Sequence, residues 1–285
     1  MHIHDMLVTA EAVLRSSGLP TPRLDAEVLL AACLGCDRLA LYRASSDTVT
    51  GEATATFTDW IERRSRREPV AYIVGEKEFW SLPFSVDGHV LIPRPDTEVL
   101  VEETLRICRD SAGRDSVTIL DVGTGSGAIS VALARECRQV TVVALDNSLH
   151  ALRVARRNAE RHRVRGSIAF VLGNLLEPLR GKFDIIISNP PYISEGEYDR
   201  LPPEVRDYEP RDALVAGPCG TEVHEALIGG AADILRQGGW IVMEMGAGQR
   251  GAVEAALRAS GNFDDMRVRP DYGGIDRVVA ARRRQ

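Results

Sequence analysis

The chain has 285 residues, of which 44% are hydrophobic and 27% charged, and its formal net charge at pH 7 is −6. This composition is typical of a globular protein of one or two domains, and it excludes a disordered, fibrous or collagen-like chain. The negative charge also argues against a protein that coats nucleic acid, because such proteins are normally basic.

The N-terminal sequence, MHIHDMLVTAEAVL, lacks the charged segment and the long apolar segment of a signal peptide. The longest apolar stretches reach about half of the ~20 residues that a membrane helix needs. We therefore expect a cytoplasmic protein that does not associate with a membrane.

The first part of the chain has the apolar spacing of helices. Helices are expected over 5–17, from Pro22 to Cys36 and over 52–67, with Thr21 as the N-cap of the second. The third helix ends in an arginine cluster, Arg63 to Arg67. Cations suit the last turn of a helix, so a solvated helix end and a docking patch both remain open for this cluster.

The five cysteines are odd in number and scattered, which does not indicate a disulfide framework. Cys33 and Cys36 form a C-x-x-C motif, but a zinc site needs two further ligands and the sequence offers no second pair. The motif also ends a helical segment instead of following a strand. We expect both to be structural residues and predict no metal site.

A hairpin is expected next, because EFWSLPFSV and HVLI flank the turn-forming pair Asp87-Gly88. The loop from Pro93 to Asp96 then leads into an amphipathic helix, TEVLVEETLRIC. These patterns divide the chain into a small helical domain (1–74), a β-hairpin connector (75–92) and a larger domain (93–285).

From residue 117 onward, short strands rich in Val and Ile alternate with helices, which predicts a mostly parallel, doubly wound α/β sheet. The strands are expected over 117–122, 139–146, 167–172, 183–188 and 239–246, with helices near 127–137, 149–163 and 221–237. After a helix near 249–260, segments 263–270 and 276–282 are expected to form an antiparallel hairpin at one edge.

A glycine-rich loop directly follows the first of these strands: Gly123, Thr124, Gly125, Ser126 and Gly127. Its glycines allow a tight turn and the close approach of a ligand to the backbone. The loop also fits the looser dinucleotide pattern, in which Ala128 takes the last position.

The next strand ends in Asp146, which is placed to accept hydrogen bonds from ribose hydroxyls. Such an acid occurs in dinucleotide sites and in methyl-donor sites alike. These residues alone do not separate the two sites.

The sequence Asn189-Pro190-Pro191-Tyr192 follows the strand at 183–188, at a strand end where doubly wound folds bind ligands. A planar sp² nitrogen is a poor nucleophile because its lone pair is delocalised. The Asn189 side-chain oxygen and the Pro190 carbonyl can accept its two hydrogens and aim the lone pair at an electrophile. The double proline stiffens the backbone, and Tyr192 offers a flat face for stacking.

Two further residues, Asn174 and Leu175, come just after the third strand. In this kind of fold that position faces the adenine of a bound donor. Asn174 can accept from the adenine amino group and Leu175 can pack on the ring.

The order of the glycine-rich loop, the acid and NPPY resembles class I S-adenosylmethionine-dependent amino-methyltransferases. Three further segments narrow the resemblance to the HemK/PrmC family of release-factor glutamine methyltransferases, over essentially the whole chain. They are EPVAYIVGEKEF (68–79), LIPRPDTE (91–98) and YEPR (208–211). NPPY alone is shared with DNA adenine and ribosomal-RNA guanine methyltransferases.

The resemblance implies a fold, a donor and a substrate. The fold would be a class I methyltransferase domain (93–285), linked by the β-hairpin to a small N-terminal helical domain (1–74) that docks the substrate. S-adenosylmethionine would donate its methyl group to the N5 amide nitrogen of the Gln in the Gly-Gly-Gln loop of class I peptide-chain release factors. S-adenosylhomocysteine would be the second product.

The resemblance also implies residue roles. Gly123 to Gly127 would line the methionine and ribose of the donor, with Asp146 on the ribose and with Asn174 and Leu175 at the adenine. Asn189, Pro190, Pro191 and Tyr192 would hold the Gln amide, with Asn189 also near the donor. Pro93 and Arg94 would border the substrate entrance. Family members often carry an acid where Asn174 stands.

Three alternatives are weighed against this reading. An adenine-N6 or guanine-N2 nucleic-acid methyltransferase would hold its planar target nitrogen with the same amide clamp, Asn189 to Tyr192. The net charge and the absence of a recognisable target-recognition domain oppose this alternative. A non-catalytic donor-binding protein would not need the clamp, and a nicotinamide dehydrogenase is the third option.

We expect a monomer without stably bound nucleic acid. Glu244, near a strand end, receives no catalytic role.

Overall fold

The computed structural model describes residues 1–110, 116–177 and 179–285. The described chain divides into two compact units. One unit contains Met1–Glu76 together with Pro202–Tyr208, and the other contains Lys77–Leu201 together with Glu209–Gln285. The chain therefore passes between the units three times, at residues 76/77, 201/202 and 208/209.

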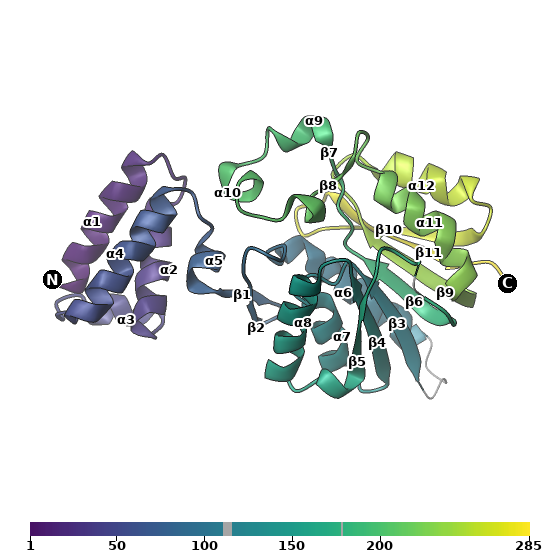
Figure 1. The fold of residues 1–285 in the computed structure, drawn as a ribbon, viewed down its shortest axis with the longest axis horizontal. Coiled ribbons are helices and arrows are strands. Elements are labelled where there is room, and N and C mark those ends of the chain that lie inside the picture. Colours follow the sequence, from purple (N-terminus) through teal and green to yellow (C-terminus); the bar gives the residue numbers. More distant parts are fainter. Residues whose placement is uncertain (111–115, 178) are drawn as a thin grey trace. The chain divides into compact units, whose positions relative to one another are not determined.

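The first unit is helical; its residues 1–76 are purple and blue in Figure 1, and its returning segment with α10 is green. Its helices are α1 (Ile3–Ser16), α2 (Pro22–Leu34), α3 (Arg38–Arg43), α4 (Gly51–Ser65) and α5 (Val70–Val74), joined by α10 (Pro203–Arg206) from the returning segment. The three long helices agree with the expectation, whereas α3, α5 and α10 were not predicted. Thr21 does stand at the N-cap of α2, but its hydroxyl donates to Asp25 instead of capping the helix.

The arginine cluster at the end of α4 is engaged inside its own unit. Arg64 is buried and pairs with Asp25 at 2.7 Å and with Glu204 at 3.4 Å. Arg67 binds the same Glu204 at 3.2 Å. Two of the cluster's guanidinium groups thus bind the segment Pro202–Tyr208.

The second unit contains a mixed sheet of seven described strands, in the order β10-β11-β9-β6-β3-β4-β5. The strands are β3 (Val117–Val122), β4 (Val140–Asp146), β5 (Ile168–Leu172), β6 (Phe183–Ser188), β9 (Leu235–Glu244), β10 (Phe263–Pro270) and β11 (Asp276–Arg283). The first five are parallel, and β10 and β11 run antiparallel at one edge. The predicted α/β architecture is confirmed.

Helices cover both faces of this sheet (Figure 1). The apolar cluster on one face includes side chains of α6 (Glu98–Asp110) and α7 (Ala128–Glu136), next to α8 (Leu149–Arg161). The cluster on the other face includes α11 (Glu222–Ile234) and α12 (Arg250–Ala259). The strands between them carry long runs of Val and Ile because a parallel sheet is buried on both sides.

The remaining described elements are short. They are η1 (Pro95–Thr97), η2 (Arg165–Ser167), β7 (Ile193–Ser194), α9 (Glu195–Tyr198), η3 (Arg211–Ala213) and β8 (Val215–Gly217). The strands β7 and β8 pair with each other after the NPPY sequence. No helix of the described residues is long and apolar enough to cross a membrane.

The expected hairpin forms, but its turn lies elsewhere. The strands are β1 (Glu76–Phe79) and β2 (Leu82–Ser85), so Trp80 and Ser81 make the turn, and Asp87-Gly88 lies beyond the hairpin. Both turn residues have φ of +54°, a left-handed conformation that short hairpins require but that these residue types seldom adopt. Tertiary contacts hold it, because the Trp80 indole donates to Glu136 at 2.9 Å.

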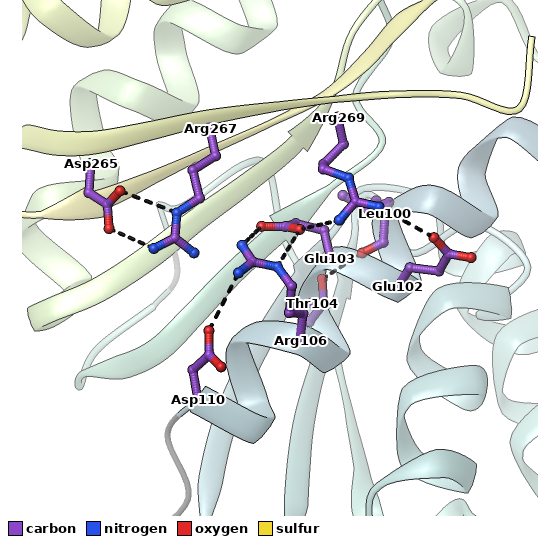
Figure 2. Close-up of polar contacts among 9 residues, drawn as sticks. All are labelled: Leu100, Glu102, Glu103, Thr104, Arg106, Asp110, Asp265, Arg267 and Arg269. Atoms are coloured by element: carbon purple, nitrogen blue, oxygen red, sulfur yellow. Dashed lines mark hydrogen bonds and ion pairs between the residues drawn. The ribbon is translucent and has the colours of Figure 1, made fainter. Parts of the chain in front are cut away.

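A charged network ties α6 to the edge strand β10 (Figure 2). Glu103 is fully buried and accepts hydrogen bonds from Arg106 at 2.9 Å and from Arg269 of β10 at 3.3 Å. A buried carboxylate is costly unless it is paired in this way. The network therefore fixes the antiparallel edge against the helix layer.

Candidate active site

The glycine-rich loop and NPPY meet because β3 and β6 are neighbours whose ends are in register. Val122 pairs with Ser188, the last residue of each strand, and the Ser188 hydroxyl donates to the Val122 carbonyl at 2.7 Å. The strand order reverses between β3 and β6, which is where open α/β sheets bind ligands. Both motifs therefore start at the topological switch point of the sheet.

The backbone of the glycine-rich loop is open to a ligand. Gly123, Gly125 and Gly127 have φ of +74°, +55° and +78°, which side-chain-bearing residues rarely adopt. A Cβ at Gly127 would lie 2.9 Å from the Ala155 Cβ, so this glycine lets α8 pack closely. Nothing lies within 4 Å of a Cβ built at Gly123 or Gly125, so the space above these two is free.

A buried acid stabilises the same loop through hydrogen bonds. Asp121, at 0% exposure, accepts from the Thr124 hydroxyl at 2.7 Å and the Ser130 hydroxyl at 2.6 Å. Burial raises the pKa of this carboxyl to about 6. Asn158 of α8 also binds the loop, by donating to the Ser126 carbonyl at 2.8 Å. The sequence alone did not indicate either supporting role.

Asp146 ends β4 beside the loop. One carboxylate oxygen accepts from the Gly125 backbone at 2.8 Å and the other from the Ser148 backbone at 2.9 Å. Burial raises its pKa, against the effect of these backbone donors. Each oxygen retains a second lone pair, so the carboxylate can still accept from hydroxyl groups of a ligand.

Asn174 and Leu175 follow β5 at the same edge of the sheet, where the Gly173 backbone donates to the Asp146 carbonyl at 3.0 Å. Leu175 has φ of +48°, an unusual value for a bulky residue. Strained backbone of this kind is found preferentially where a ligand is held. Both residues line the cavity described below.

The amide of Asn189 is oriented by a neighbouring hydroxyl. Its Nδ2 donates to the Oγ1 of Thr97 at 3.2 Å. Because the nitrogen end is engaged there, Oδ1 is the end left to accept from a ligand. Thr97 belongs to the quoted segment LIPRPDTE, but sequence reasoning gave it no role in the site.

Tyr192 is held at both its ends. Its hydroxyl donates to Glu244 Oε1 at 3.4 Å, and burial raises the pKa of Tyr192 to about 12. Its carbonyl accepts from the Gln249 side chain at 2.8 Å, and the same amide nitrogen also binds the Gly220 carbonyl at 3.1 Å. Gln249 was not anticipated, because a lone Gln after a strand carries no recognisable signal.

A cavity of about 480 Å³ brings most of the expected residues together. Its lining includes Pro93, Arg94, Gly123, Thr124, Gly125, Ser126, Asp146, Asn174, Leu175, Asn189, Pro190 and Pro191. Gly127 and Tyr192 lie outside the lining, and Gly127 stands at the N-terminus of α7. His89 and His150, which were not singled out, also line the cavity, with ring centres 4.5 Å apart.

Arg94 is fixed at the cavity by a buried partner. Glu209, whose side chain is 1% exposed, accepts from the Arg94 guanidinium and from the Ile92 backbone at 3.1 Å. Glu209 belongs to the YEPR segment quoted above. The pair therefore connects two of the segments that carry the family resemblance.

Within the described ranges no group of three or more His, Cys, Asp or Glu side chains is arranged to hold a metal. The five cysteines are free thiols, and Cys33 donates to the Ala53 carbonyl at 3.3 Å.

Comparison with known proteins gives the family. A family model for the PrmC N-terminal domain matches residues 5–75, and one for the methyltransferase small domain matches residues 97–201. The release factor glutamine methyltransferase of Geobacter sulfurreducens is 42% identical over 98% of this chain and 96% of its own length. The chain belongs to the release factor glutamine methyltransferase family.

A second relative, the release factor glutamine methyltransferase of Rhodopirellula baltica, is 39% identical over 93% of this chain and 91% of its own length. Among solved structures, a methyltransferase from Pyrococcus furiosus aligns with a TM-score of 0.53 and 19% identity. That alignment covers 73% of this chain and 92% of the other. It shows the methyltransferase fold, and the curated relatives show the family.

Proposed function

We propose that the chain transfers a methyl group from S-adenosylmethionine to the N5 side-chain amide nitrogen of the Gln in the Gly-Gly-Gln loop of class I peptide-chain release factors. The observation that carries the proposal is the oriented Asn189 at the switch point, beside the open glycine-rich loop. An amide clamp next to a donor cradle is suited to methylating a planar nitrogen.

The donor fits the residues present. Gly123 and Gly125 leave free space for the methionine and ribose part, and Asp146 retains lone pairs for the ribose hydroxyls. Asn174 and Leu175 lie at the next strand end, where the adenine would reach. When bound, the donor supplies an electrophilic methyl group on a sulfonium.

The clamp acts by position. Asn189 Oδ1 and the Pro190 carbonyl accept the two amide hydrogens of the substrate Gln, which fixes the amide plane and directs the nitrogen lone pair at the methyl carbon. A nitrogen–carbon bond forms as the sulfur–carbon bond breaks. Attack by the neutral nitrogen would give an N-methylated amide cation, which is strongly acidic and loses one proton to water, so no strong base is required.

The direct test is mass spectrometry of the Gly-Gly-Gln peptide after a release factor is incubated with donor and enzyme. We expect the mass of one methyl group on the Gln and none on the same peptide without donor. A parallel incubation with radiolabelled donor and bulk DNA or RNA tests the nucleic-acid alternative. Label in nucleic acid alone would contradict the proposal.

The partner is proposed to be the release factor alone, with no stably bound nucleic acid and with the enzyme as a monomer. The net charge of −6 supports this, since it disfavours binding to a polyanion. Because release factors act at the ribosome, we propose that the reaction takes place in the cytoplasm. Sedimentation of the enzyme alone and with a release factor measures the oligomeric state and the complex.

A further inference from the structure

The side-chain amide of Gln249 joins three segments of the chain next to the clamp. Gln249 is the N-cap residue of α12. Its Nε2 donates to the Tyr192 carbonyl at 2.8 Å and to the Gly220 carbonyl at 3.1 Å, and its Oε1 accepts from the Gly246 backbone at 2.8 Å. A primary amide has two N–H hydrogens. Both are therefore used, and the three partners together fix the orientation of the amide.

Two buried glycines allow this close approach. A Cβ at Gly220 would lie 2.8 Å from the Tyr192 carbonyl oxygen. A Cβ at Gly246 would lie 2.9 Å from Gln249 Oε1 and 3.1 Å from Cδ2 of the Tyr192 ring. Since β7 follows Tyr192 and β8 precedes Gly220, the one amide binds the chain beside both strands of this short pair.

The turn that carries Gln249 is itself fixed to the sheet. The Met245 backbone donates to the Arg277 carbonyl of β11 at 2.8 Å, and the Met245 carbonyl accepts from the Arg277 guanidinium at 3.2 Å. The turn is closed by the Gln249 backbone, which donates to the Gly246 carbonyl at 3.1 Å. A side chain on such a rigid support can hold a neighbouring segment in place.

The clamp is a short segment that is held near both its ends. At its start, the Ser188 hydroxyl donates to the carbonyl of the last residue of β3 at 2.7 Å. Proline rings fix φ at Pro190 and Pro191, so the direction of the Pro190 carbonyl depends mainly on where the ends of the segment are held. Gln249 holds the second end, at the Tyr192 carbonyl.

We propose that Gln249 is a positioning residue whose amide fixes the Tyr192 end of the clamp, so that the Pro190 carbonyl faces the amide hydrogens of the substrate Gln. The proposal rests on the function proposed above. Gln249 is not among the residues that line the cavity, and it acts through the backbone. The donor cradle lies at the ends of β3, β4 and β5, so donor binding should not depend on Gln249.

The experiment measures kcat, KM for the release factor, donor affinity and the free energy of unfolding. Gln249→Met keeps a similar length and loses all three hydrogen bonds. Gln249→Glu keeps an acceptor for Gly246 but turns a carboxylate toward two carbonyl oxygens. In Gln249→Met kcat should fall by about tenfold to a hundredfold, the cost of a small misplacement of reacting groups. In Gln249→Glu it should fall at least as far, with donor affinity unchanged in both variants.

The contact can also be displaced from its other side. Gly246→Ala adds a methyl group against the Gln249 amide and the Tyr192 ring. This variant should lower kcat more than it raises KM, again with donor affinity unchanged. It carries the test if either Gln249 variant does not fold.

Asp184→Asn is the matched control. Asp184 is also buried, and its side chain accepts from the Thr118 backbone at 2.9 Å and from Arg236 at 2.8 Å. It lies near the start of β6, at the opposite end of the strand from the clamp. Its replacement should lower the free energy of unfolding and leave kcat unchanged.

Three outcomes overturn the inference. They are wild-type kcat in Gln249→Met or in Gln249→Glu, a loss of donor affinity as large as the loss of kcat, and a fall of kcat in Asp184→Asn as large as that in Gln249→Met. Failure of the proposed function would be seen separately, as wild type leaving the release factor unmethylated.

Discussion

At the scale of the residue, the site depends on few side chains whose orientation is set by neighbours. Asn189 is oriented by Thr97, and Asp146 is fixed by two backbone donors. Neither residue needs an unusual chemical property. What matters is which lone pairs remain free for ligands, and single substitutions should therefore separate substrate positioning from donor binding.

Replacing Asn189 by Ala should reduce kcat by roughly a hundredfold or more, the size of effect seen when a positioned hydrogen-bonding group is lost. Donor affinity should stay largely intact, because the glycine-rich loop and Asp146 are untouched. Methylation kinetics together with calorimetric titration of the donor make the measurement. Unchanged turnover would refute the clamp.

Replacing Asp146 by Asn should have the opposite effect, because it should impair donor binding and not substrate positioning. The carboxamide presents one acceptor where the carboxylate presents two, so it cannot accept from both Gly125 and Ser148 and also from ribose hydroxyls. We expect donor binding to weaken by about tenfold or more. Titration with S-adenosylhomocysteine checks this without turnover, and equal affinity in the variant would remove Asp146 from the donor site.

At the scale of the element, strand ends and a short hairpin place these residues. The register between β3 and β6 puts the two motifs side by side, and the register between β6 and β9 adds Glu244. The hairpin packs on the same helix layer through the buried pair Phe79 and Phe84, whose ring centres are 6.1 Å apart. This packing holds the hairpin turn in its unusual backbone conformation.

Ser81→Gly should raise the free energy of unfolding by up to about 1 kcal/mol, because glycine adopts the left-handed turn without strain. Trp80→Gly should lower it, because the indole loses its hydrogen bond to Glu136 and its packing. Urea unfolding of the two variants and wild type provides the comparison. If Ser81→Gly proves as destabilising as Trp80→Gly, the turn does not store strain.

At the scale of the whole molecule, the chain itself links the units. The segment Pro202–Tyr208 follows the NPPY region in sequence yet belongs with the helical unit. Its Glu204 binds Arg64 and Arg67, and the Tyr208 hydroxyl donates to the Arg66 carbonyl at 2.6 Å. Glu209, the next residue, already holds Arg94 at the cavity.

Glu204→Ala should therefore speed amide hydrogen exchange in residues 202–208 several-fold, while exchange in the sheet strands stays unchanged. Glu62→Ala is the matched control, since Glu62 pairs with Arg66 but its side chain is 60% exposed, and exposed pairs contribute little. Exchange followed by mass spectrometry makes the comparison. Equal protection of this segment in Glu204→Ala and wild type would show that the two arginines do not hold it.

The alternation of β-branched strands with amphipathic helices, and the motifs at the strand ends, are local properties. They sufficed to predict the α/β architecture, the antiparallel edge and the family. The domain boundaries at 74 and 92 and the individual roles of the site residues stay predictions. Most of the expected residues do line one cavity, because parallel strands end at the same edge of a sheet.

Other features depend on contacts between residues that are distant in the sequence, and no local sequence pattern predicts such contacts. Asp87-Gly88 has the better turn sequence, but packing of Phe79, Trp80 and Phe84 moves the turn to Trp80-Ser81. Thr97 binds Asn189, Glu244 binds Tyr192 and Glu204 binds Arg64. Each of these contacts joins residues that lie far apart in the sequence. Hydrogen bonds and charge pairs between distant segments exist only after folding, so they could be found only in the tertiary structure.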